Sequence, residues 1–130
     1  MPAAAAAPAG PPRALTVSAA GHSLKASLVH VCLRHGTSTD CRASRVRLRG
    51  TLAVGSRAVL SLRFDRRATS VSVALVRGVT TVRAATSAHG SGTAFRWAAP
   101  ASLGGANRLD VVAKYGKSDS RFAARIKRAR

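Results

Sequence analysis

The clearest indication of the fold lies in the segment Leu109–Ile126, which reads LDVVAKYGKSDSRFAARI. Apolar side chains occupy every second position on both sides of a polar turn at residues 116–119: Leu109, Val111, Ala113 and Tyr115 before it, Phe122, Ala124 and Ile126 after it. Successive side chains of a β-strand point to opposite faces of the sheet. This alternation therefore predicts two half-buried strands joined as a hairpin.

The same period of two recurs along most of the chain, broken by clusters of Gly, Ser, Asp and Asn. It predicts further strands near residues 15–17, 24–32, 45–49, 58–64, 71–75 and 95–97, with a weaker segment around Val79 and Val82. The turn at Asp65–Arg67 indicates that the segments 58–64 and 71–75 form a second hairpin. Because no helical periodicity separates these segments, we predict an all-β fold, an antiparallel β-sandwich or barrel of seven to eight strands.

The chain length of 130 residues fits one domain of ordinary size. Residues 1–14 are rich in Ala and Pro, and we expect them to form a disordered leader or tether. We place the folded domain at residues 15–127 and a short basic tail at 128–130. The hydrophobic fraction of 46% is sufficient for a core.

Acidic side chains are scarce, with 4 Asp+Glu against 22 Lys+Arg and a formal net charge of +18. Paired-carboxylate catalysis and oxygen-ligand metal cages have little to draw on. Gly116-Lys117-Ser118 is similar to the end of a P-loop, but Val111 stands where that motif needs glycine. We expect a noncatalytic protein without a cofactor. No apolar run is long enough to span a bilayer.

Cys32 and Cys41 are the two cysteines, and a polar loop containing Gly36 separates them. A disulfide closing so short a loop would stabilise the fold by about 3 kcal/mol in the chain-entropy description. We predict this disulfide, which requires an oxidising compartment. Two buried free thiols are the alternative.

A third interpretation of these cysteines is a zinc or redox site. His30, Cys32, His35 and Cys41 supply four nitrogen or sulfur donors within a dozen residues. The spacing lacks the paired-ligand knuckles of common zinc sites. Redox activity would need an exposed thiolate, which the neighbouring Arg34 and Arg42 would favour.

Taken together, these features resemble the small immunoglobulin-like β-sandwich modules of exported bacterial proteins. The resemblance covers roughly residues 15–127 and rests on four features: Gly21-His22-Ser23-Leu24-Lys25-Ala26 after an opening strand, Cys32 paired with Asp40-Cys41, Trp97 to Pro100, and Leu109 to Ala113. It implies an immunoglobulin-like fold and an extracytoplasmic location. Asn107 stands where such modules commonly carry an aromatic residue, so the tyrosine-corner hydrogen bond is not expected.

The basic residues predict contact with anionic polymers, because guanidinium groups bind phosphate and carboxylate in a bidentate manner. The predicted polyanion-binding residues are Arg45, Arg47 and Arg49 on one strand face, and Arg121, Arg125, Lys127, Arg128 and Arg130 near the C-terminus. Alternatively, these arginines simply occupy solvent-facing strand positions. Stacking aromatics, which nucleic-acid readers usually add, are few.

We therefore expect a structural or adhesion module of an exported bacterial protein that contacts cell-envelope polyanions or nucleic acid nonspecifically. No signal peptide is visible in Met1–Ala14, yet the predicted disulfide favours an extracytoplasmic or secreted location. The alternative is a cytoplasmic nucleic-acid-binding protein, and a weaker one is the zinc or redox protein.

Overall fold

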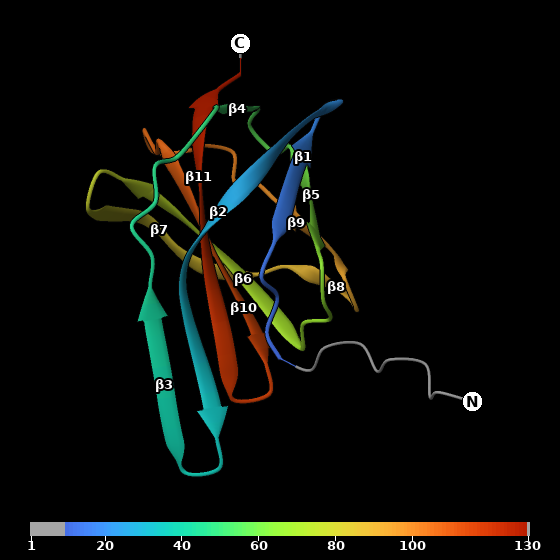
Figure 1. The fold of residues 1–130 in the computed structure, drawn as a ribbon. Helices are drawn as coiled ribbons and strands as arrows, with labels where there is room; N and C mark the ends of the chain where they lie inside the picture. The colour runs from blue at the N-terminus through green and yellow to red at the C-terminus, as the bar shows by residue number, and fades with distance from the viewer. Residues whose placement is uncertain (1–9, 130) are drawn as a thin grey trace.

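The computed structural model describes residues 10–129, which form an 11-stranded, all-β structure without a helix (Figure 1). The strands are β1 (Leu15–Ala19), β2 (His22–His35), β3 (Ser38–Ala43), β4 (Leu52–Val54), β5 (Val59–Phe64), β6 (Ser70–Arg77), β7 (Thr80–Ser87), β8 (His89–Ser91), β9 (Ala94–Ala98), β10 (Arg108–Tyr115) and β11 (Ser118–Arg128).

The strands form one strongly bent sheet in the order β7-β6-β10-β11-β2-β1-β5-β9-β8, with β3 added to β2 and β4 to β11. β2 belongs to both halves of this sheet, because residues 22–26 pair with β1 and residues from 27 onward pair with β11. On the other side, β7 and β8 are separated by Ala88 alone. The sheet therefore folds over on itself into a nearly barrel-like sandwich. Its pairings are antiparallel except for the parallel β4–β11 pair.

The core consists of the inward-facing apolar residues of both halves. Phe64 lies at its centre, with ring centroids 5.9 Å from Phe95 and 5.8 Å from Phe122. Burying such a side chain contributes roughly 1.5–3 kcal/mol. Trp97 is 4% exposed, and its Nε1 donates a hydrogen bond of 2.8 Å to Thr86 Oγ1. That bond connects β9 to β7, two strands that do not pair with each other.

The all-β prediction and the hairpin formed by β10 and β11 are confirmed. The strand count is eleven rather than seven to eight, because β3, β4 and β8 form from short or wholly exposed segments. The hairpin predicted for residues 58–64 and 71–75 is wrong, since β5 pairs with β1 and β9, whereas β6 pairs with β7 and β10. Both strands direct apolar side chains into one core from opposite layers. Alternation alone does not distinguish two such strands from the two strands of a hairpin.

The strand predicted over Arg45–Arg49 is also wrong. This segment has no regular secondary structure and connects β3 to β4. Ser44 N donates to Val29 O at 2.8 Å, but residues 45–49 pair with no strand. A segment with alternating side chains forms a strand only when the edge of a neighbouring strand supplies partners for its backbone hydrogen bonds.

The chain packs against the fold from Pro11 onward. Pro11 and Pro12 are buried, and Ser120 Oγ donates to Pro12 O. Asp65 Oδ1 accepts hydrogen bonds from Arg13 N at 2.9 Å and Ala14 N at 3.0 Å. Most of the predicted leader, residues 1–9, and Arg130 of the predicted tail lie outside the described residues.

Candidate polyanion-binding surface

Four of the predicted C-terminal basic residues, Arg121, Arg125, Lys127 and Arg128, lie on β11. Alternation there buries Phe122, Ala124 and Ile126, and it directs Arg121 and Arg125 to the outer face of the sheet. Arg125 lies directly opposite Arg108 on β10. Like charges in such a pair destabilise a sheet, and Arg108 is compensated by Asp110, whose Oδ1 accepts from Arg108 Nε at 2.9 Å.

This outer face is hollowed into a groove of about 570 Å³. Its polar lining includes His30, Arg108 and Arg121, and its apolar lining includes Val46 and Leu48 of the segment that connects β3 to β4. Arg45, Arg47 and Arg49 are exposed on the same segment. The alternation in this segment therefore separates apolar from basic side chains, although the segment is not a strand.

The remaining predicted residues do not join this groove. Lys127 and Arg128 are exposed at the end of β11, where they pair with Ala53 and Val54 of β4. Arg128 lines a separate cavity of about 260 Å³, and Arg130 lies outside the described residues. The seven predicted residues that the structure describes are thus distributed along the molecule and do not form one patch.

A second concave site lies where the β2–β3 and β10–β11 turns meet the N-terminal segment. We call it the basic cleft and define it by its four cationic side chains: Arg13, Arg34, Arg66 and Lys117. Its volume is about 540 Å³, and Tyr115 and His35 also line it. In Figure 1 the β2–β3 hairpin extends past the turn between β10 and β11 at one end of the molecule.

The electrostatics of the basic cleft favour an anion, because its lining contains four cations and no carboxylate. Asp65 is close by, with Oδ2 3.9 Å from Arg66 Nε, but its other oxygen accepts from two backbone N–H groups. Arg34 is oriented locally, because its Nε donates to Gly36 O at 3.1 Å. Its backbone N also donates to Ser118 Oγ at 2.8 Å, which connects the two turns.

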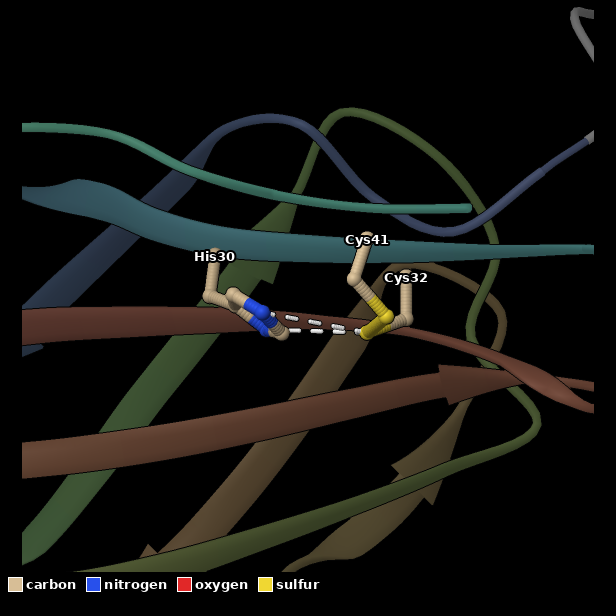
Figure 2. A group of neighbouring side chains, drawn as sticks. All are labelled: His30, Cys32 and Cys41. Atoms are coloured by element: carbon tan, nitrogen blue, oxygen red, sulfur yellow. Dashed lines mark hydrogen bonds between the residues drawn. A yellow bond between two sulfur atoms is a disulfide. The ribbon is translucent and has the colours of Figure 1, made fainter. Parts of the chain in front are cut away.

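The predicted disulfide is present between Cys32 and Cys41. These residues are direct partners in the β2–β3 pairing, so the disulfide links two neighbouring strands. His30 lies beside it, with Nδ1 3.7 Å from Cys32 Sγ, and Figure 2 shows the imidazole edge facing the sulfur atoms.

Of the four donors proposed for a zinc site, the structure brings together His30, Cys32 and Cys41 but not His35. Residues an odd number apart on a strand face opposite sides, and His35 lines the basic cleft instead. No cysteine is free, so the thiols that zinc or thiolate redox chemistry requires are absent from this oxidised form. A disulfide is typical of proteins that fold in an oxidising compartment.

Sequence reasoning missed the basic cleft because its arginines and lysine are far apart along the chain and share no motif. The available signal was their position beside predicted turns at Gly36, Asp65 and Gly116. The ends of β2, β5 and β10 must lie together for these turns to converge, and the strand order of the folded sheet determines this.

Comparison with protein-family models, with curated proteins and with solved structures returned no match. Within residues 10–129, no helix is long and apolar enough to cross a membrane.

Proposed function

We propose that this chain is a noncatalytic, immunoglobulin-like β-sandwich module of an exported bacterial protein, which binds phosphate- or sulfate-bearing polymers through the basic cleft. The convergence of four cations without a lining carboxylate carries this proposal. The layered antiparallel sheet and the disulfide support a structural module from an oxidising compartment.

The charge balance of the whole surface supports the same conclusion. Three carboxylates each have an arginine within ion-pair distance: Asp40 with Arg42 at 3.7 Å, Asp65 with Arg66 at 3.9 Å, and Asp110 with Arg108 at 2.9 Å. Since the net charge is +18, positive charge remains in large excess after these ion pairs are counted. Release of condensed counterions from the polymer then drives binding, which weakens as salt rises.

Binding to heparin and to duplex DNA at increasing salt tests the proposal. We expect retention at low ionic strength and a log–log salt slope of about −0.9 per phosphate contacted in the duplex. The variant Arg34→Gln/Lys117→Gln removes two cations from the basic cleft. It should flatten the slope by about 1.8 if both side chains contact phosphate.

The matched control is Arg63→Gln/Arg96→Gln, which removes the same charge from exposed positions of β5 and β9 on the opposite layer. We expect it to leave the slope within about 0.5 of the parent value. Equal effects of the two pairs would show that the cleft is not the binding site. Failure of the parent chain to bind either polymer at low salt would refute polyanion binding altogether.

The predicted outer-face residues are tested in the same assay. Arg121 lines the outer-face groove, and Arg125 is exposed on the same strand. We expect Arg121→Gln/Arg125→Gln to flatten the salt slope less than the cleft variant does, because the carboxylate of Asp110 also lines that groove. A larger change would move the binding surface from the cleft to the groove.

The alternative, a cytoplasmic nucleic-acid-binding protein, predicts reduced cysteines. Thiol titration of the protein, isolated without reductant and then unfolded in denaturant, distinguishes the two. An exported module should show no reactive thiol and a mass lower by two hydrogens, whereas two thiols per chain would favour the cytoplasmic alternative.

A further inference from the structure

The surroundings of the disulfide contain a set of donor atoms that polyanion binding does not use. His30 and Cys32 lie two residues apart on β2 and therefore share a face of the sheet, and Cys41 lies opposite Cys32 on β3. The ligand atoms of these three residues all lie within 4.8 Å of one another. Two positions on one strand and one on its neighbour thus bring a nitrogen and two sulfurs into one small cluster.

The distances between the His30 nitrogens and Cys32 Sγ match those between two ligands of a tetrahedral zinc ion. Zinc bonds of about 2.3 Å to sulfur and 2.0 Å to nitrogen place ligand atoms about 3.6 Å apart for a nitrogen–sulfur pair and about 3.8 Å apart for two sulfurs. His30 Nδ1 and Nε2 are 3.7 Å and 3.9 Å from Cys32 Sγ. The histidine is already at ligand spacing, and the covalent bond between the sulfurs is what prevents binding.

A second observation concerns Asp119, the partner of Cys32 on β11. Strand partners project from the same face of the sheet. Asp119 Oδ1 is buried and accepts no hydrogen bond within the described part of the chain, although a buried carboxylate oxygen without a partner is costly. A cation bound beside Cys32 would compensate it.

We propose that reduction of the Cys32–Cys41 bond creates a zinc site whose protein ligands are His30, Cys32 and Cys41, with the Asp119 carboxylate as a neighbouring group outside this ligand cluster that compensates the charge of the ion. A dithiol reductant transfers two electrons and two protons to the disulfide, which yields two thiols and an oxidised dithiol. Zinc then displaces both thiol protons. Arg121, which lies opposite His30 on β11, favours the thiolates electrostatically.

The structural consequence is that one position holds the β2–β3 hairpin in two alternative ways. The disulfide connects the strands under oxidising conditions, and the metal connects the same residues under reducing conditions. Because metal ligands must be brought together by the fold, zinc binding contributes to the stability of the reduced chain. This inference does not depend on the polyanion-binding proposal.

The test uses the full chain, reduced with a phosphine that is then removed without oxygen. Zinc is titrated into the reduced and oxidised forms, and native mass spectrometry gives the metal content. We expect a single zinc ion per reduced chain and none per oxidised chain. Cobalt(II) in place of zinc should give the visible absorption of a tetrahedral thiolate complex.

Three variants assign the ligands. His30→Ala should abolish the tetrahedral cobalt spectrum, and Asp119→Asn should weaken zinc binding by about 10- to 100-fold. His35→Ala is the matched control and should bind zinc as the parent does. Equal zinc affinity of His30→Ala and the parent would overturn the proposed ligand set.

Circular dichroism of the reduced chain, recorded before and after zinc, covers the case in which reduction unfolds the protein. In that case zinc must restore the β spectrum. If the reduced chain, folded or unfolded, binds no zinc, or if the oxidised chain binds it equally well, the proposal is refuted.

Discussion

Replacing both cysteines, Cys32→Ala/Cys41→Ala, should destabilise the protein in a way that the structure makes quantitative. The bond joins residues at a sequence separation of 9, for which the chain-entropy relation gives about 2.6 kcal/mol. Side-chain burial in β3 compensates little for this loss of stability, because all residues of β3 are exposed. For a domain of this size the melting temperature should fall by about 8 to 15 °C.

Denaturant unfolding followed by circular dichroism measures the change, and the reduced parent chain in metal-free buffer should unfold at the same denaturant concentration as the double variant. Hydrogen exchange should show the largest loss of protection in β3, because the disulfide lies in the hairpin that β3 forms with β2. Thr39→Ser, which keeps the bond and alters an exposed side chain of β3, should change stability by less than about 0.5 kcal/mol.

A double variant with the same unfolding midpoint and the same β3 protection as the oxidised parent would contradict this expectation. Such a result would mean that pairing between β2 and β3 is already fixed in the unfolded chain, or that the hairpin lies outside the cooperative unit.

Three further predictions concern the core and its backbone, with denaturant unfolding as the common assay. Phe122→Ala should cost about 3–5 kcal/mol, because Phe122 is 1% exposed and contacts the central aromatic ring. Gly90→Ala should cost at least about 2 kcal/mol, since φ is +152° and an added Cβ would lie 2.2 Å from Ala94 O. Trp97→Phe should cost about 1 kcal/mol through loss of the hydrogen bond to Thr86.

Each of these has a control on the same molecule. Val112→Ala, half-buried on the outer face of β10, should cost clearly less than Phe122→Ala. Gly21→Ala has a positive φ of +81° but open space around its Cβ, so it reports the backbone conformation alone, about 1–2 kcal/mol. In a double-mutant cycle, Thr86→Val should cost nothing further in the Trp97→Phe background; full additivity would contradict that hydrogen bond.

Prediction of the fold from sequence succeeded where local periodicity was sufficient and failed where a partner had to be chosen. The hairpin of β10 and β11 was predictable, because alternation and a short turn specify a local antiparallel pair. The separation of β5 from β6 was not, because a five-residue connection between layers has the same polar composition as a hairpin turn. Arg45–Arg49 shows the converse case, an alternating segment without an edge to pair with.

The candidate sites divide in the same way. The disulfide was predictable from two cysteines flanking a polar turn, and its His30 neighbour follows from a spacing of two on a strand. The exclusion of His35 also follows from strand parity. The basic cleft was not predictable, because its residues come from four separate segments whose approach depends on strand order.

The all-β class, the excess of positive charge and the cysteine pair can be read from composition and from spacing within single segments. Which strands are neighbours, and hence that Arg13, Arg34, Arg66 and Lys117 surround one cleft, depends on the folded sheet. Alternation specifies which face of a strand is buried, but it carries no information about which strand lies on the other side of the hydrogen bonds.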